Sequence, residues 1–375
     1  MFGAYRSKRA GLAALLALPV AAAAVIGLVS ASPASAHPDH ENAVTCRQYG
    51  HIPVALVAGQ PASYTVAGEL CTTAAERRAG TTVQLLVHGA TYNHDYWDFG
   101  TVHGVDYSYA RDVAARGIAT FAVDEIGAGA SSRPASSEVT IQAAAYVAHQ
   151  LVHDLRDGSA TGTRFRKVVA MGHSLGSVVV WQEAISYGDV DGVIVTGAAH
   201  SLSVRFQPTV FHSVTDDPAF AASGLDAGYL TTVPGVRGAT FYHTPDADPA
   251  VIARDEATKD VLSGTEIGTG LPIVTSTVTR AIHVPVLTIL GSQDLTTCGP
   301  NTQGGTFQCS TGAAVAAQEK PFYSADADIH GCVVPGAGHG LSLALNNRVQ
   351  VLDAVAWTLR YVDGHHGDRL PHDCG

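Results

Sequence analysis

The chain has 375 residues, of which 46% are hydrophobic and 15% are charged, and its formal net charge at pH 7 is -11. This composition is typical of a globular protein with a sizeable core, and it excludes a disordered or fibrous chain. An acidic surface repels nucleic acid and anionic membranes, so we expect neither as a partner.

The first 36 residues form a segment of their own. Arg6, Lys8 and Arg9 precede the apolar run GLAALLALPVAAAAVIGLVSA, which ends in SPASA. This order predicts a signal peptide over residues 1–36, cleaved after Ala36, and therefore a secreted protein. The run is longer than is usual for a signal peptide, so an uncleaved membrane anchor is the alternative. No later stretch is long and apolar enough to span a membrane, and we expect no stable insertion of the mature chain.

Apolar runs and helical patterns alternate through most of the remaining sequence. We expect strands at about residues 52–56, 62–71, 81–89, 118–127, 167–174, 192–198, 284–294 and 331–340. We expect helices at about residues 107–117, 139–157, 175–188 and 343–362. Alternating strands and helices form parallel crossovers, so the fold class is α/β, with a doubly wound, mostly parallel sheet.

Residues 198–281 interrupt this alternation, because Pro, Gly, Asp and Thr are scattered through them without a clear pattern. A structureless loop of that length is unusual inside a compact domain, so we expect a cap or lid inserted over one end of the sheet. The α/β core would then comprise residues 37–197 and 282–375. We expect the acidic stretch of the cap, residues 246–256, to be a solvated surface.

All six cysteines follow the expected cleavage site, which suits three disulfides in an oxidising compartment. Proximity favours Cys46 with Cys71 and Cys298 with Cys309, which leaves Cys332 with Cys374. A zinc site is the weaker alternative, because no two cysteines have a C-x-x-C spacing.

The motif GHSLG, residues 172–176, stands where a strand passes into a helix. A G-x-S-x-G sequence at that junction places the Ser on a sharp, strained turn, and the flanking glycines avoid collisions of a Cβ atom with neighbouring backbone. The hydroxyl of Ser174 would then point away from the sheet, beside the N–H groups that begin the helix. This arrangement favours a nucleophile.

A serine hydroxyl needs a base to take its proton and an acid to orient that base. Asp294 follows the apolar run that ends in GSQD, and His339 follows the run that ends in GAGHG. The carboxyl ends of parallel strands lie at one edge of a sheet, so both side chains should meet Ser174 there.

Four features together make the chain similar to the α/β-hydrolase family: VHG after an early strand, DEIGAGASSRP after the next, GHSLG, and the GSQD and GAGHG endings. The resemblance implies a nucleophile at Ser174, an acid at Asp294 and a base at His339. It also implies an oxyanion hole made by the N–H groups of Leu175 and Ala90, with Thr91 as the fallback for Ala90. No metal or organic cofactor is implied.

Several other polar and aromatic residues near these motifs and at the C-terminus could also have a function. Tyr92, Tyr96 and Trp97 would contact substrate, and His88 would shape the oxyanion turn. His94, Asp95 and Asp98 could form a metal site, but a polar loop is the simpler interpretation. His365, His366 and His372 could form another, but a solvated terminus is simpler.

The most economical hypothesis is a secreted serine hydrolase that cleaves carboxylic esters of small molecules or lipids. Peptidase, thioesterase, C–C hydrolase and cofactor-free haloperoxidase chemistry remain open, because relatives with these activities keep the Ser triad. Dehalogenase and epoxide hydrolase chemistry is disfavoured, because those relatives have Asp at the position of Ser174. A non-catalytic binding module on the same scaffold is the alternative from another class of protein.

Overall fold

The computed structural model describes residues 43–365, 370–371 and 374–375. The signal peptide expected over residues 1–36 lies outside the described residues, as do His366 and His372 of the tail. Within the described part of the chain, no helix is both long enough and apolar enough to cross a membrane.

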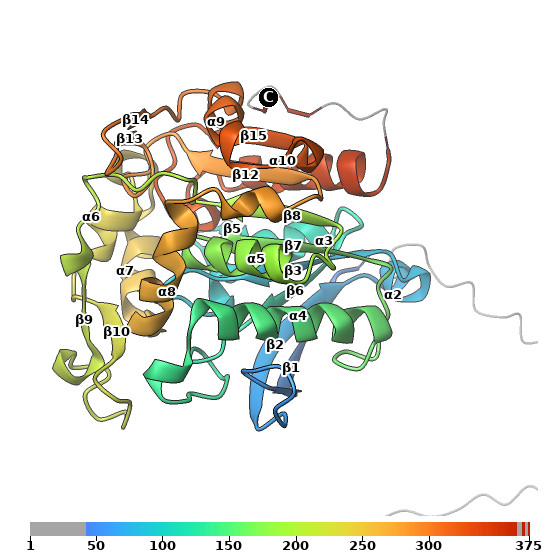
Figure 1. The fold of residues 1–375 in the computed structure, drawn as a ribbon, viewed down its shortest axis with the longest axis horizontal. Helices are drawn as coiled ribbons and strands as arrows, with labels where there is room; N and C mark the ends of the chain where they lie inside the picture. The colour runs from blue at the N-terminus through green and yellow to red at the C-terminus, as the bar shows by residue number, and fades with distance from the viewer. Residues whose placement is uncertain (1–42, 366–369, 372–373) are drawn as a thin grey trace, which may run out of the picture. The chain divides into compact units, whose positions relative to one another are not determined.

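The centre of the fold is an eight-stranded sheet (Figure 1). In spatial order its strands are β1 (Thr45–Val54), β2 (Tyr64–Thr72), β6 (Ala119–Val123), β3 (Thr82–Val87), β7 (Lys167–His173), β8 (Gly192–Thr196), β12 (Val286–Gly291) and β15 (Ile329–Val334). β2 pairs antiparallel with both β1 and β6, and all later neighbours are parallel. The expected mostly parallel α/β sheet is therefore confirmed.

Helices cover both faces of this sheet, which explains why β3, β6, β8 and β12 are buried at every position. On one face α4 (Ile141–Asp157) packs against α5 (Leu175–Ser186), and on the other α3 (Tyr109–Ala114) packs against α10 (Arg348–Trp357). Side chains of β3 alternate between the two cores. Val83, Leu85 and Val87 join the core under α4 and α5, while Leu86 joins the opposite one.

Helix α4 shows how the sequence fixes the ends of these elements. The hydroxyl of Thr140 accepts a hydrogen bond from the N–H of Ala143, which satisfies one free donor of the first turn. At the other end Gly158 has φ = 82°, a left-handed conformation that favours glycine. The helix thus lies within two residues of the range expected from the sequence.

Residues 198–281, here called the insert, lie between β8 and β12 and contain their own small elements. These are the antiparallel strands β9 (Phe211–Ser213), β10 (Tyr229–Thr232) and β11 (Leu262–Ser263), and the helices α6 (Arg237–Phe241), α7 (Pro249–Ala257) and α8 (Gly264–Val274). In Figure 1 the helices of the insert lie beside one end of the main sheet, near the start of α5.

Three disulfides join the cysteine pairs that proximity and elimination favour. Cys46–Cys71 connects the paired strands β1 and β2, and Cys298–Cys309 closes the loop that follows β12. Cys332–Cys374 ties the C-terminal residues to β15. This pairing is compatible with an oxidising environment.

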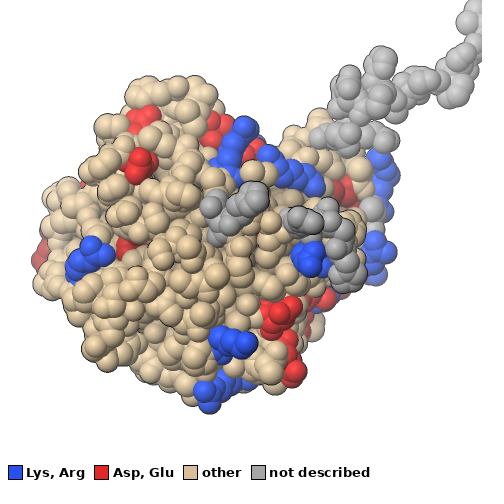
Figure 2. Space-filling view, turned by 90° about the horizontal axis from the view of Figure 1, so that it is seen from above, with Lys and Arg blue, Asp and Glu red and all other residues tan. Residues whose placement is uncertain are grey.

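Charged side chains are sparse on the face drawn in Figure 2. Most of that face consists of residues other than Lys, Arg, Asp and Glu, and the basic groups lie in small, separate clusters near acidic ones. This face therefore has no extended basic patch.

Candidate active site

Ser174 lies on a strained turn between the last residue of β7 and the first residue of α5, with φ = 53° and ψ = -117°. Residues other than glycine rarely adopt a positive φ, and such strain is concentrated at functional sites. The flanking glycines allow the turn. A Cβ atom on Gly172 would lie 2.2 Å from the carbonyl oxygen of Gly176, and one on Gly176 would lie 2.2 Å from that of His88.

Asp294 and His339 follow β12 and β15, which are adjacent parallel strands. Nδ1 of His339 lies 3.0 Å from Oδ2 of Asp294, and both side chains are buried. A carboxylate at this position fixes the orientation of an imidazole and stabilises its protonated form.

Thr296 completes this pair, and the sequence analysis missed it. Its hydroxyl donates to Oδ1 of Asp294 at 2.7 Å and lies 2.8 Å from Nδ1 of His339, while its N–H also donates to Oδ1. The proton on Nδ1 is therefore shared between Asp294 and Thr296, which leaves Nε2 as the nitrogen that can accept a proton. No sequence pattern distinguishes a Thr that contacts the histidine from any other Thr in a turn.

Ser174 and His339 line the same cavity, which has a volume of about 150 Å³. Ala90 and Leu175, the expected oxyanion donors, line it too. Gly89 brings the Ala90 turn close, because a Cβ atom there would lie 3.0 Å from Cβ of Ser174. Thr91, the fallback, is fully buried and its hydroxyl accepts a hydrogen bond from Arg237 at 2.6 Å.

The remaining cavity wall is mostly apolar, and much of it comes from the insert. α8 contributes Ile267, Gly270, Leu271 and Val274, which recur at the spacing of one helical face. Other apolar side chains of the insert that line the cavity are Leu202, Phe206, Phe211 and Phe241. The cavity therefore offers an apolar surface beside one serine and one histidine.

Comparison with known proteins identifies the family. Residues 84–354 match the family model described as "Alpha/beta hydrolase family", which covers more than half of the chain. The chain belongs to the alpha/beta hydrolase family. None of the curated protein sequences matched it.

Solved structures similar to this alpha/beta hydrolase share its fold at low sequence identity. A candidate aryl esterase from Burkholderia cenocepacia has a TM-score of 0.54 and 14% identity, over 84% of this chain and 100% of that one. A soluble variant of monoglyceride lipase from Saccharomyces cerevisiae has a TM-score of 0.53 and 17% identity, over 83% and 96%. A 2-hydroxy-6-oxo-6-phenylhexa-2,4-dienoate hydrolase from a Rhodococcus species has a TM-score of 0.50 and 14% identity, over 82% and 97%.

The three aromatic residues expected to contact substrate occupy different places in this alpha/beta hydrolase. Tyr92 lines the cavity. Tyr96 and Trp97 are buried and are not among the lining residues: Tyr96 stacks on His173 at 4.4 Å between ring centroids, and Trp97 packs against Tyr109 at 5.2 Å. We therefore keep only Tyr92 as a candidate substrate contact.

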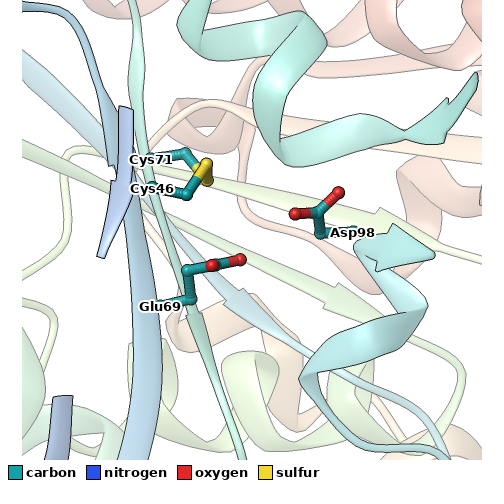
Figure 3. Close-up of side chains that lie close together, drawn as sticks. All are labelled: Cys46, Glu69, Cys71 and Asp98. Carbon is teal, nitrogen blue, oxygen red and sulfur yellow. A yellow bond between two sulfur atoms is a disulfide. The ribbon is translucent and has the colours of Figure 1, made fainter. Parts of the chain in front are cut away.

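The polar residues near Tyr92 make internal contacts. Nδ1 of His94 lies 2.7 Å from Oδ1 of Asp124, and although burial opposes the charge, this hydrogen bond and the nearby carboxylates raise the pKa of His94 to about 9. Asp98 is held by a two-pronged hydrogen bond from Arg111. Figure 3 shows its carboxylate facing Glu69, beside the Cys46–Cys71 disulfide.

A buried ion pair connects the insert of the hydrolase to the turn after β3, which contains Ala90 and Thr91. The guanidinium of Arg237 donates to both carboxylate oxygens of Asp255 at 2.9 and 2.8 Å, and it also donates to the Thr91 hydroxyl. The same guanidinium lies over the Tyr92 ring, 4.4 Å from its centroid. The expectation that the acidic stretch 246–256 is solvated is wrong for Asp255, because this residue is buried against Arg237.

Two buried carboxyl groups lie behind the oxyanion turn. Glu125 follows β6, Glu266 belongs to α8, and both line a small cavity together with Ala90 and Leu175. Burial raises the pKa of Glu266 to about 8, and burial together with the neighbouring Glu266 raises the pKa of Glu125 well above its ordinary value. At neutral pH this pair carries at least one proton.

His88 lies between that pair and the turn. Its Nε2 accepts a hydrogen bond from the N–H of Glu125 at 3.1 Å, and its Nδ1 lies 2.9 Å from the carbonyl oxygen of Gly89. Burial lowers its pKa, which keeps the ring neutral. A neutral ring with one donor and one acceptor suits the expected role of shaping the oxyanion turn.

Proposed function

We propose that this alpha/beta hydrolase is a secreted serine hydrolase that cleaves carboxylic esters through an acyl-enzyme on Ser174. The observation that carries the proposal is the strained Ser174 turn, which faces the same cavity as a histidine held by Asp294. A serine with a positive φ on a turn from strand to helix is typical of the nucleophile in alpha/beta hydrolases.

In the proposed first step, Nε2 of His339 takes the proton of the Ser174 hydroxyl as the oxygen attacks the ester carbonyl carbon. The N–H groups of Ala90 and Leu175 stabilise the negative oxygen that forms. The bond to the alcohol then breaks, and the alcohol leaves with the proton from His339. A water molecule then attacks the acyl carbon while His339 takes its proton. His339 returns this proton to the Ser174 oxygen as the carboxylic acid leaves, which regenerates Ser174.

The cavity supports a substrate with an apolar acyl or aryl group. Phe206, Phe211 and Phe241 line the same cavity as Ser174, and its lining residues include no Lys, Arg, Asp or Glu. A neutral small-molecule or lipid ester buries its apolar part there without losing a charge interaction. The proposed chemistry needs no metal and no organic cofactor.

We infer that the insert acts as a cap. Its helix α8 contributes one face to the cavity, and Leu271 on that face is 45% exposed, so this residue lies at the opening. Residues of the insert would therefore decide which acyl groups enter. Secretion is supported by the three disulfides, which are typical of oxidising compartments.

The test is hydrolysis of p-nitrophenyl esters from acetate to palmitate by the mature protein and by its Ser174→Ala variant. We expect the wild type to cleave at least one chain length and the variant to lose this activity at least a thousandfold. Equal hydrolysis by both proteins, or by neither, would exclude the proposed function. A melting temperature for Ser174→Ala that matches the wild type rules out unfolding as the cause.

A further inference from the structure

Two histidines on α4 and an aspartate after α5 converge on one point of the surface. His149 and His153 are four residues apart, so both lie on the same face of the helix. Nδ1 of His149 lies 2.7 Å from Oδ2 of Asp189, and Nε2 of His153 lies 3.2 Å from the same oxygen. One ligand atom from each residue lies within 4.8 Å of the other two.

These short contacts are not satisfied as hydrogen bonds. Among the described residues, Nδ1 of His149 and both carboxylate oxygens of Asp189 are buried polar atoms without a hydrogen-bond partner. Leaving such atoms unpaired costs free energy, and each case calls for an explanation. A metal ion bound by these converging atoms would satisfy them.

A fourth buried group stands directly behind the cluster. Glu183 of α5 is fully buried, and no N–H or hydroxyl of the described residues reaches either of its oxygens. Its carboxyl group lies next to that of Asp189. A carboxylate that ligates a metal in a protein commonly has such a polar group behind it.

The surroundings also fix the first histidine and leave the second accessible. The ring of His149 stacks on Tyr187, with 4.0 Å between centroids and an interplanar angle of 16°. The side chain of His153 is 61% exposed, so the cluster is open to solvent on that side. The nearby guanidinium of Arg156 is engaged by Asp191 and by the backbone oxygen of Asp189.

We propose that His149, His153 and Asp189 bind a divalent transition-metal ion of the Zn²⁺ type. Two imidazole nitrogens and one carboxylate oxygen are ligands that Zn²⁺ prefers, and the exposed side leaves a position for water. Neighbouring ligands around a tetrahedral Zn²⁺ lie about 3.3 Å apart. Nε2 of His153 lies 3.2 Å from Oδ2 of Asp189, and Nδ1 of His149 lies 2.7 Å from the same oxygen, so the His149 ring would move slightly outward on binding.

The site lies at the far end of the helix that begins beside Ser174. Helix α5 has 12 residues, which corresponds to about 18 Å along its axis. An ion there would join α4 to the segment between α5 and β8 without touching the cavity. Its role is therefore to stabilise the fold, and it takes no part in hydrolysis.

Two other clusters of Cys, Asp and Glu are less suited to a metal ion. One contains Cys46 and Cys71, and the other contains Cys332 and Cys374. In both clusters the sulfur atoms already form a disulfide. Neither cluster therefore provides a thiolate, whereas the imidazoles of His149 and His153 are available as they stand.

The experiment titrates Zn²⁺ into the mature protein, purified without a histidine tag, in a calorimeter. The variants are His153→Gln, whose exposed side chain makes no packing contribution to the core, and the matched control His283→Gln. His283 also lies near a carboxylate, 3.3 Å from Asp326, but it belongs to none of the groups of potential metal ligands found among the described residues. Ca²⁺ serves as the control ion, because it prefers sites made of oxygen ligands.

We expect a Zn²⁺ site in the wild type and in His283→Gln, with at least tenfold weaker binding in His153→Gln and no comparable binding of Ca²⁺. Zn²⁺ should raise the melting temperature of the wild type and the control but not of His153→Gln, while the three metal-free proteins melt alike. The proposal is overturned if the wild type binds no Zn²⁺, or if His153→Gln binds it as tightly as the wild type, which would place the ion elsewhere, for example at the histidine-rich tail.

Discussion

At the scale of single residues, the candidate site depends on how His339 is held. Asp294 and Thr296 both contact Nδ1 of the ring, and Thr296 also donates to Asp294. Thr296 thus connects Asp294 with His339. Its hydroxyl helps Asp294 to hold the imidazole ring in one orientation.

The Thr296→Val variant tests this link, because it removes the hydroxyl and keeps the shape of the side chain. Hydrogen bonds to charged groups contribute about 1.5–3 kcal/mol, which corresponds to a loss of kcat of roughly 10- to 160-fold with little change in KM. Steady-state kinetics on the best p-nitrophenyl ester measures both constants.

The control for this variant is Thr288→Val on β12. Thr288 is equally buried, and its hydroxyl has no hydrogen-bond partner among the described residues. We expect Thr288→Val to leave kcat unchanged. If Thr296→Val behaves in the same way, Thr296 does not position the base.

At the scale of elements, the insert is joined to the core by buried polar contacts. Arg237 and Asp255 belong to α6 and α7, and the Arg237 guanidinium reaches the hydroxyl of Thr91 after β3. Breaking a buried pair leaves an uncompensated charge, which typically costs about 3–5 kcal/mol. We therefore expect Arg237→Met to lower the free energy of unfolding by about that amount, as measured by urea denaturation.

The comparison for this variant is Arg111→Met. Arg111 makes a similar two-pronged contact with Asp98, but its side chain is half exposed, so its loss should cost at most about 1 kcal/mol. In a double variant, Arg237→Met with Asp255→Leu, much of the stability should return because no lone charge stays buried. Equal effects of Arg237→Met and Arg111→Met would contradict the buried pair as a main connection.

Glu266 makes the contact between α8 and the core dependent on pH. Its pKa is raised from the ordinary 4.5 to about 8 in the folded protein. The folded state therefore favours the protonated form, and this contribution is complete below the unfolded pKa and is lost as pH rises through about 8. Stability of the wild type should fall between about pH 5 and about pH 9 relative to Glu266→Gln, which cannot ionise there.

Urea midpoints at both ends of this pH range measure the effect. The exposed Glu138 supplies the control, since Glu138→Gln should show the same pH dependence as the wild type. The neighbouring titratable groups of Glu266, which are Glu125 and His88, are unchanged in both variants. Identical pH profiles for Glu266→Gln and the wild type would show that folding does not raise the pKa of Glu266.

The elements that carry the candidate triad are predictable from the sequence, whereas several others are not. Buried parallel strands appear as continuous apolar runs, so β7, β12 and β15 are expected close to where they lie. β1 begins at Thr45, well before the expected residue 52, because its first half is polar and exposed at the sheet edge. Pairing with β2 holds that half in place.

The same distinction applies to the site. Ser174, Asp294 and His339 follow strands, and the parallel sheet brings them to one edge whatever the insert does. Arg237 and Thr91 are 146 residues apart in sequence, and their contact depends on the fold of the insert. The contacts between Glu125 and Glu266, and between Asp189 and α4, likewise have no local pattern that could predict them.

At the scale of the whole molecule, the strand order explains where the cavity forms. The chain passes from β3 to β6 on one side of β3 and then crosses from β6 to β7 on its other side, so the strand order reverses around β3. Sites in α/β sheets form at such a reversal, outside the carboxyl ends of the strands. Ala90 follows β3 and Ser174 follows β7, and both line the cavity.

The central claim is that Ser174 is an activated nucleophile, and the most direct measurement is its labelling by a serine-directed fluorophosphonate, followed by intact mass and peptide mapping. We predict one adduct per chain, located on Ser174, with labelling abolished in Ser174→Ala and strongly slowed in His339→Ala. Labelling of Ser174→Ala at the wild-type rate, or no labelling of a folded wild-type protein, would contradict the account.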